Sequence, residues 1–403
     1  MPGQGEIKRS EIQHIANDYD LNNIHIGIFG SHSALPVGFA AKKANIPSLI
    51  FTKKGREKTY AKYNRTLYDD VIVIEEWEDM LSEETQEMMR RKNVVFIPNR
   101  SFVVYVGLKQ IESEFLIPIY GSRKLLRSEE RTAPPPRNQY YLLKQANIRT
   151  PKLFESPDEI DRLSVVKVQQ KDNPLERAYF YPSNPEEYYK VSEKKIKAGE
   201  ISEEGLRKAA IEEFVIGPML NANFHSYALN LSDSQSKFPN DFDLVGFSDR
   251  EQTNETGFRR LPADIQMELS ERGFRRTNEE ICHRGKTLRE SKLEMVYENA
   301  EKLMKTLKEE VPPGMIGPIG IQGAVPIDEK DRPEFVIFDL SFRVPGDPAI
   351  GPTSPYLRYL DVKHEEEYAK FMPSNWKIKE PLDLSMMEIK RAIHEQELEK
   401  IVT

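Results

Sequence analysis

The sequence contains a single cysteine, Cys282, in 403 residues, and it has no long uninterrupted run of apolar residues. One cysteine excludes an internal disulfide and a cysteine-rich zinc site, and a lone cysteine is most often a small hydrophobic side chain. A membrane-spanning helix needs about 20 predominantly apolar residues. The first twenty residues also have no apolar core typical of a secretory signal. We therefore expect a cytoplasmic protein with no membrane partner.

The chain also has fewer basic than acidic residues. Lysine and arginine total 58 against 65 aspartate and glutamate residues, which gives a net charge of −7. Proteins that bind nucleic acid neutralise its phosphates with an excess of basic residues, so we expect no nucleic-acid partner. A local basic pocket for a small anion stays compatible with this balance. The length leaves room for two or three domains.

The common short catalytic motifs are missing as well. The sequence has no G-x-G-x-x-G, no G-x-x-x-x-G-K-[ST], no H-E-x-x-H and no G-x-S-x-G. These absences leave the usual dinucleotide, P-loop, zinc-protease and hydrolase interpretations without their signatures. The seven histidines are scattered without the spacing of metal ligands.

The first part of the chain alternates strand and helix patterns. The apolar run IHIGIFG ends at Gly30 and predicts a buried strand, SALPVGFAAKKANI a helix, and SLIFTKK a second strand. DVIVIEEW and NVVFIPN predict two further strands around the helical MLSEETQEMMRRK. This order indicates an open, doubly wound α/β domain. Ligands of such sheets bind at the carboxyl ends of the strands, where residues 30–33 and 99–102 would lie.

The prolines of APPPR at 133–137 predict a loop beside a domain boundary. Beyond it, SVVKVQQ predicts a strand, and EEYYKVSEKKIKAGEI and SEEGLRKAAIEEF predict helices. Residues 221–246 are rich in strand formers. An amphipathic helix around 291–310 precedes an apparent hairpin of GIQGAV and EFVIFDLSF, and LSMMEIKRAIHEQELEKIV predicts a closing amphipathic helix.

Polar residues at strand ends form the candidate constellation, although each of them alone is ordinary. The set is His32, Ser101, Lys167, Glu212, Glu213, Arg250, Arg289, Glu290, Gln322, Asp339 and Arg343.

Ten segments in collinear order carry a family likeness: GSHSAL, KGREKTY, RSFVVYVGL, ESEFLIPIYGSRKLLR, ANIRTPKLFESPDEID, IEEFVIG, RRLPADIQME, RES, VPPGMIGP and the last helix. In these segments the chain resembles the archaeal formate-dependent 5-formaminoimidazole-4-carboxamide ribonucleotide (FAICAR) synthetases of the ATP-grasp superfamily. The resemblance implies an α/β and α+β protein with a Rossmann-like domain at 1–125 followed by a two-lobed ATP-grasp fold. Its small lobe would cover 126–217 and its large lobe 218–403.

The resemblance also implies an activity. Family members use ATP and Mg²⁺ (Mn²⁺ is an alternative) to activate formate, which the 5-amino group of aminoimidazole carboxamide ribonucleotide (AICAR) attacks to give FAICAR in purine biosynthesis. Small molecules are the implied partners, and a homo-oligomer is the implied assembly. Carried over by motif, the catalytic residues are His32, Arg289 and Arg250. The substrate-binding residues are Gly30, Ser31, His32, Ser33, Ser101, His283 and Arg260.

The resemblance assigns the remaining ligands to the ATP-grasp part. Lys167 would hold the α and β phosphates. The segment that receives adenine and ribose would be Glu212, Glu213, Phe214 and Val215, with either glutamate facing the nucleotide. Gln322 and Asp339, on two adjacent predicted strands, would hold Mg²⁺, a hard ion that prefers oxygen ligands.

The sequence departs from the family on the ATP side. KVQQKDNPLERAYF carries no glycine where a glycine-rich loop is expected, Tyr141 stands where a second phosphate lysine is expected, and Asp339 replaces a glutamate. Two interpretations stay open. One is an active synthetase with altered loop and metal ligands. The other is a paralogue with altered or lost ATP chemistry, which binds a purine nucleotide or joins another acid and amine.

Overall fold

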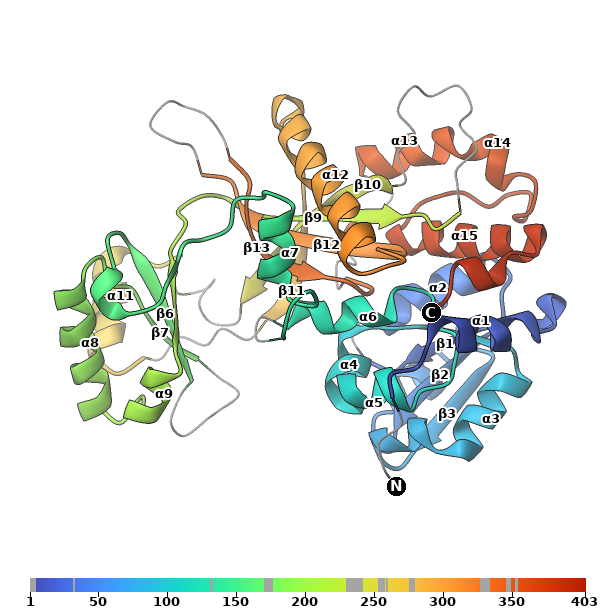
Figure 1. Cartoon of the computed structure of the whole chain (residues 1–403), viewed down its shortest axis with the longest axis horizontal. Helices are drawn as coiled ribbons and strands as arrows, with labels where there is room; N and C mark the ends of the chain where they lie inside the picture. The colour runs from blue at the N-terminus through green and yellow to red at the C-terminus, as the bar shows by residue number, and fades with distance from the viewer. Residues whose placement is uncertain are drawn as a thin grey trace.

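The structure is a computed structural model, and it describes residues 5–31, 33–130, 133–169, 177–229, 242–252, 258, 260–274, 280–326, 334–345, 349–351 and 354–403. Three sheets organise the chain (Figure 1). Among the described residues, no helix has the length and apolar character needed to cross a membrane.

The first sheet is parallel, with strand order β3-β2-β1-β4. Its strands are β1 (His25–Phe29), β2 (Ser48–Lys53), β3 (Asp70–Ile74) and β4 (Val94–Ile97). Side chains of β1 alternate between two cores, since Ile26 and Ile28 join the core that contains α2 (Ala34–Lys43), while Phe29 joins the opposite core. Helices α3 (Glu83–Arg91), α4 (Arg100–Val106) and α5 (Leu108–Ser113) complete this domain. Both faces are covered, as expected for a doubly wound parallel sheet.

The small lobe is a four-stranded antiparallel sheet with order β5-β8-β6-β7. It consists of β5 (Leu153–Phe154), β6 (Ser164–Gln169), β7 (Arg177–Phe180) and β8 (Ala210–Glu213), with α8 (Pro185–Lys197) and α9 (Glu203–Arg207). Val166 and Val168 of β6 pack with Tyr188 of α8 in its core.

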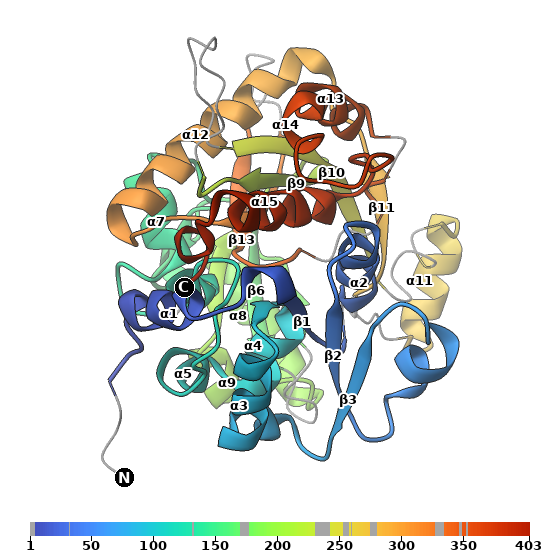
Figure 2. The same cartoon turned by 90° about the vertical axis from the view of Figure 1, so that its right-hand side faces the viewer.

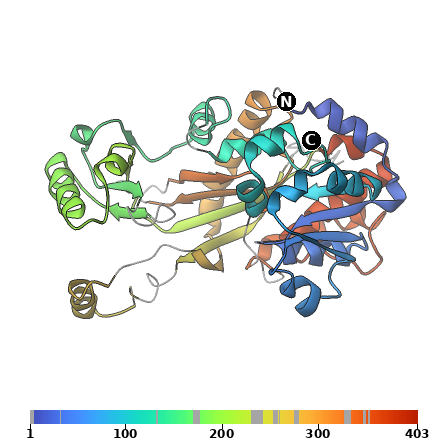
Figure 3. The same cartoon turned by 90° about the horizontal axis from the view of Figure 1, so that it is seen from below.

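The large lobe is a five-stranded antiparallel sheet with order β11-β10-β9-β12-β13. Its strands are β9 (Met219–Ser226), β10 (Phe242–Gln252), β11 (Glu280–Lys286), β12 (Gly317–Ala324) and β13 (Val336–Ser341). One face packs on α12 (Leu293–Glu310) and α7 (Gln139–Gln145). Figure 3 shows this sheet between the first domain and the small lobe, with α11 (Ala263–Glu271) projecting beyond β10 and β11.

The end of the chain returns to the first domain. Helix α6 (Arg123–Leu126) leaves the first domain, and α13 (Pro355–Lys363) and α14 (Glu365–Tyr368) follow the large-lobe sheet. The last helix, α15 (Pro381–Glu395), contacts α2, β9 and β12 (Figure 2). Thr403 exchanges two backbone hydrogen bonds with Ile119, of 3.0 and 3.1 Å. The guanidinium of buried Arg123 donates to the Thr403 carbonyl at 3.0 Å. The C-terminal residues therefore pack on the first domain, and Ile401 and Val402 belong to the core that contains α2.

The structure corrects two predicted helices. SEEGLRKAAIEEF forms only the short α9, and its second half is strand β8, paired with β5 and β6. The closing helix ends at Glu395, and Val402 forms a bridge with Tyr120 instead of continuing it. The other predicted strands and helices are confirmed for the residues that the structure describes, including the loop at 133–137 and the β12–β13 hairpin.

Candidate active site

Two loops meet at the carboxyl edge of the parallel sheet. The Ser31 and Ser101 hydroxyl oxygens lie 2.7 Å apart and share a hydrogen bond. Asn99 joins the loops as well, because its side-chain amide donates to the Phe29 carbonyl at 2.8 Å and its oxygen caps α4 by accepting from the Phe102 N–H. The predicted substrate residues of the two segments are thus brought together, with His32 lying outside the described residues.

The backbone around this edge is tightly placed. A Cβ on Gly30 would lie 2.8 Å from the Phe51 carbonyl oxygen, so a side chain there would displace backbone. Ser33 has φ of 70°, a left-handed conformation that non-glycine residues rarely adopt. The turn between β1 and α2 is therefore constrained on both sides of position 32.

A row of polar residues crosses the large-lobe sheet. Asn221 of β9 is paired directly with Ser248 of β10 and with Gln322 of β12, and Gln322 is paired with Asp339 of β13. Directly paired residues of a sheet share a face. The alternate residues Leu220, Ala222 and Phe224 face the core under α12, so the row lies on the opposite face.

This polar face is buried, and several of its atoms lack partners. In the part of the chain that the structure describes, the Asn221 side-chain nitrogen, the Asn223 side-chain oxygen and the Ser248 hydroxyl have no hydrogen-bond partner. These residues are 6%, 2% and 0% exposed. Buried polar groups in proteins are nearly always hydrogen-bonded. Such a cluster therefore indicates a face that receives a ligand or ordered water.

Gln322 and Asp339 give this face two side-chain oxygens, on adjacent strands, that could act as metal ligands. Among the described residues no cluster of three or more His, Cys, Asp or Glu side chains could hold a metal by itself. Mg²⁺ commonly takes one or two protein oxygens and completes its shell with water and phosphate. The pair therefore fits Mg²⁺ that arrives with a nucleotide.

Glu129 was not among the predicted residues, yet it lies beside Asp339. Burial raises the pKa of Glu129, and the negative charge of Asp339 acts in the same direction, against Arg343 and Arg100. Its carboxylate accepts from the Phe342 N–H at 2.9 Å and from Arg100 at 3.2 Å. Glu129 thus ties the Arg100–Ser101 segment of the first domain to the strand that carries Asp339.

Lys167 and Glu212 form an ion pair between β6 and β8. Their side chains are 16% and 3% exposed. A buried carboxylate requires a partner, so this pair fixes where the Lys167 ammonium lies. The two residues are contributed by adjacent strands of the small lobe, next to the segment that leads to the large lobe.

Glu213 points to different partners. Its carboxylate accepts two 2.8 Å hydrogen bonds from Arg149 and one of 2.9 Å from the Lys152 N–H. Phe214 is exposed and packs edge-on against Tyr181, with ring centroids 5.0 Å apart, and Val215 is half-buried. Of the two glutamates, Glu212 is therefore the one placed against Lys167.

The predicted arginines come from different segments of the chain. Arg250 of β10 is paired by backbone register with His283 of β11, and the Arg250 side chain lies outside the described part. Arg260 is exposed just before α11. Arg289 lines a pocket with Lys286, Lys292 and the 216–218 segment. The described structure does not bring these side chains into one cluster.

Tyr141 is tied to the core helix. Its hydroxyl donates to the Glu310 carboxylate at 3.0 Å, and this hydrogen bond raises the pKa of Tyr141. The residue therefore joins α7 to α12, and its hydroxyl is committed to that contact.

The residues that sequence reasoning missed are Asn221, Asn223, Ser248 and Glu129. A signal for the first two is present in MLNANFHS, where asparagine alternates with apolar residues as expected for a strand with one polar face. Ser248 and Glu129 give no such signal, because their relevance depends on strand register and on a contact between domains.

A parallel sheet followed by a small antiparallel lobe and a larger antiparallel sheet with one polar face defines a Rossmann-like domain joined to an ATP-grasp fold. A crystal structure of an IMP biosynthesis protein, PurP, from Thermococcus kodakaraensis has this fold. It is 20% identical, with a TM-score of 0.61, and the match covers 94% of this chain and all of that one.

Sequence relatives identify the family. This chain is 34% identical to the 5-formaminoimidazole-4-carboxamide-1-(β)-D-ribofuranosyl 5'-monophosphate synthetase of Methanopyrus kandleri over 89% of this chain and 92% of the relative. It is 32% identical to the protein of the same name from Methanobrevibacter smithii, over 99% of this chain and all of the relative. The chain belongs to this family of FAICAR synthetases.

Two family models divide the chain in a matching way. Residues 26–154 match a protein of unknown function (DUF1246) and residues 187–403 match a domain of unknown function (DUF1297). The first match covers the parallel sheet, and the second covers the large-lobe sheet and α15.

Proposed function

We propose that this protein is an ATP- and formate-dependent ligase that converts AICAR to FAICAR in purine biosynthesis. The observation that carries the proposal is the family relationship over nearly the whole chain, at 32% identity with a relative covered end to end. The Ser31–Ser101 contact and the buried polar sheet face support it, since they supply a place for a nucleotide substrate.

The reaction has two steps that balance. A formate oxygen attacks the γ-phosphorus of ATP and releases ADP, which gives formyl phosphate. The 5-amino nitrogen of AICAR then attacks the formyl carbon, phosphate leaves with the electron pair of the broken C–O bond, and the amine loses a proton. Formyl phosphate is reactive, so water has to be kept from it.

The residues would divide the work by location. Lys167, held by Glu212, would bind the ATP phosphates, and the segment 212–215 would receive adenine and ribose. Gly30, Ser31, Ser33 and Ser101 would hold the AICAR side, with His32 between them. In this proposal Arg250, Arg260, His283 and Arg289 take the remaining contacts with phosphate, formate and AICAR.

Gln322 and Asp339 would hold Mg²⁺ that enters with ATP. The ion would neutralise phosphate charge that develops during transfer. What these two residues do by themselves is present paired oxygens across β12 and β13 beside the sheet face.

The test is ADP release by the purified protein with ATP, Mg²⁺, formate and AICAR, each omitted in turn. Release that requires both formate and AICAR, with FAICAR as product, is the expected result. No release, with AICAR still bound in calorimetry, would instead favour a paralogue that keeps the pocket for recognition. Release that depends on another acid or amine would identify a different ligase.

A further inference from the structure

Two buried asparagines lie side by side on the central strand of the large lobe. Asn221 and Asn223 are two residues apart on β9 and therefore share a face. The atom without a partner is a nitrogen donor on Asn221 and an oxygen acceptor on Asn223. A buried donor and a buried acceptor that both lack partners are thus presented from one strand.

Glycines flank Asn223 in the sheet, and apolar side chains border it. Its direct neighbours on both adjacent strands are glycines, Gly246 and Gly320. A Cβ on Gly246 would lie 2.8 Å from Ile350, whereas a Cβ on Gly320 would make an ordinary 3.4 Å contact with Pro345. Ile350 and Pro345 therefore border the space above the asparagine.

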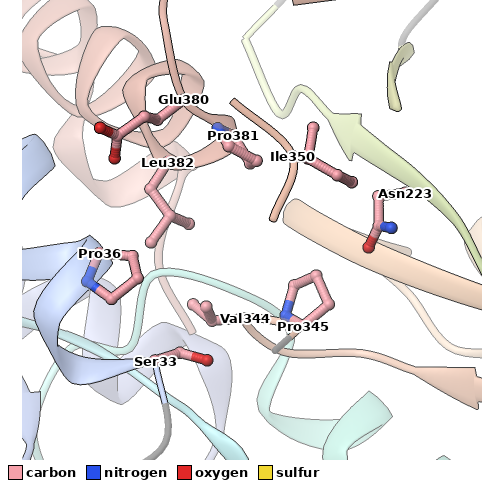
Figure 4. Close-up of a pocket in the computed structure, with 9 residues that line it drawn as sticks. All are labelled: Ser33, Pro36, Asn223, Val344, Pro345, Ile350, Glu380, Pro381 and Leu382. Atoms are coloured by element: carbon pink, nitrogen blue, oxygen red, sulfur yellow. The ribbon is translucent and has the colours of Figure 1, made fainter. Parts of the chain in front are cut away.

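That space is a cavity between two domains. Asn223, Val344, Pro345 and Ile350 line it from the large-lobe side, and Ser33 lines it from the first domain (Figure 4). Ser33 belongs to the same short loop as Ser31, which is hydrogen-bonded to Ser101. Asn223 therefore faces the carboxyl edge of the parallel sheet, where the nucleotide substrate is expected.

The chemistry of the pair selects a neutral ligand group. A phosphate or carboxylate offers only acceptors and would leave the free oxygen of Asn223 without a donor. A primary carboxamide offers an acceptor oxygen and two N–H donors in one plane, which complements one free donor and one free acceptor.

We propose that Asn221 and Asn223 bind the carboxamide group of the imidazole ribonucleotide and thereby set specificity for it. This inference rests on the proposed function for the identity of the nucleotide. Ser248 is paired with Asn221 and supplies a third polar atom on the same face. The pair are specificity residues, since no bond is made or broken at them.

The experiment compares two ligands in calorimetry, AICAR and 5-aminoimidazole ribonucleotide, which carries hydrogen in place of the carboxamide. The wild type should prefer AICAR. Asn221→Leu and Asn223→Leu keep the number of side-chain heavy atoms and their branching and remove the polar atoms. Each should reduce the ratio of the two dissociation constants about tenfold, the change typical of losing one hydrogen bond of about 1.4 kcal/mol. Affinity for 5-aminoimidazole ribonucleotide should hardly change.

Stability separates this role from a structural one. Replacing a buried polar atom that lacks a partner removes a desolvation cost, which offsets the long 3.4 Å hydrogen bond that the Asn223 amide nitrogen donates to the Asn221 carbonyl, so the Leu variants should melt close to the wild-type temperature. Ser48→Ala is the matched control, because the Ser48 hydroxyl is also buried without a partner but lies at the start of β2, away from the carboxyl edge. It should leave the ratio unchanged.

Asn221→Ser and Asn223→Ser give the same comparison with shorter polar side chains if a Leu variant fails to fold. An unchanged ratio in the folded variants of both positions would overturn the inference and indicate that the face holds ordered water. Absence of formate-dependent ADP release together with a lost AICAR preference in the variants would reject the proposed function and still support the inference.

Discussion

At the scale of single residues, substitution of Lys167 should affect both ATP-dependent turnover and protein stability, and the two effects can be measured separately. Lys167→Met should lower kcat/KM for ATP by about 10- to 100-fold, because a hydrogen bond to a charged group is worth about 1.5–3 kcal/mol. It should also destabilise the protein by about 3–5 kcal/mol, since the buried ion pair with Glu212 is broken. Steady-state kinetics and denaturant unfolding measure the two effects.

The double variant Lys167→Met with Glu212→Gln is the control for this prediction. It removes both charges, so stability should recover while kcat/KM stays low. Recovery of activity together with stability would mean that Lys167 serves only to pair Glu212 and does not bind ATP.

His364 gives a second prediction at this scale, on pH. Burial acts to lower the pKa of His364, but the hydrogen bond to Asp243 and the nearby Glu367 carboxylate outweigh it and leave the pKa raised. The His364 imidazole lies 2.7 Å from the Asp243 carboxylate and 3.7 Å from Glu367, with the Tyr227 hydroxyl at 3.4 Å, and Lys363 also contacts Asp243. The imidazolium is thus favoured in the folded state.

A raised pKa of a base stabilises the folded protein most below its unfolded-state pKa of about 6.5, and this contribution is lost as pH rises through the folded-state value. The pKa of Asp243 is lowered, so its contribution needs a pH above about 4. The melting-temperature difference between wild type and His364→Gln should therefore be larger at pH 6 than at pH 9. An equal difference at both pH values would contradict the ion pair.

At the scale of elements, β12 and β13 form the hairpin that pairs Gln322 with Asp339. The pairing contains an irregularity between Gln322 and Gly323. A Cβ on Gly323 would lie 2.4 Å from the Val336 carbonyl oxygen, which is backbone and cannot rotate away. Gly323→Ala should therefore cost about 1–3 kcal/mol of unfolding free energy, as overpacking does.

Gly323→Ala should also weaken Mg²⁺-dependent ATP binding, since the strands that hold the two oxygens must separate. Gly320→Ala on the same strand is the matched control for stability, because its Cβ would make only contacts of 3.4 Å or longer. Chemical denaturation of both variants makes the comparison. Equal stability would show that the hairpin yields without strain.

The sequence predicts an element well where local patterns determine it and poorly where pairing with distant strands does. The parallel sheet and its Ser31–Ser101 edge follow from local patterns plus the rule for ligand position in α/β sheets. Strand β8 was predicted as a helix because Ala and Glu are strong helix formers, and pairing with β5 and β6 overrides that preference. The polar alternation in MLNANFHS indicates that Asn221 lies on a polar strand face, but its register with Ser248 and Gln322 was missed because no single strand encodes it.

At the scale of the whole molecule, Glu388 of α15 joins the first domain to the large lobe. Its carboxylate accepts from the Tyr120 hydroxyl at 2.6 Å and from the Ala228 and Leu229 N–H groups at 2.6 and 3.2 Å. The buried core around it contains residues of β1, α2 and α15. The first domain and the C-terminal helix should therefore unfold together.

The two tryptophans allow a direct test, since Trp77 lies in one core of the first domain and Trp376 packs in the core shared with α15. In single-tryptophan variants, Trp77→Phe and Trp376→Phe, fluorescence should give the same guanidinium midpoint.

Glu388→Leu should lower stability by about 1–3 kcal/mol for each backbone donor left without an acceptor and should split the two midpoints. Glu388→Gln keeps an acceptor oxygen for those donors and should keep the midpoints together. Coincident midpoints in Glu388→Leu would show that apolar contacts alone couple the domains.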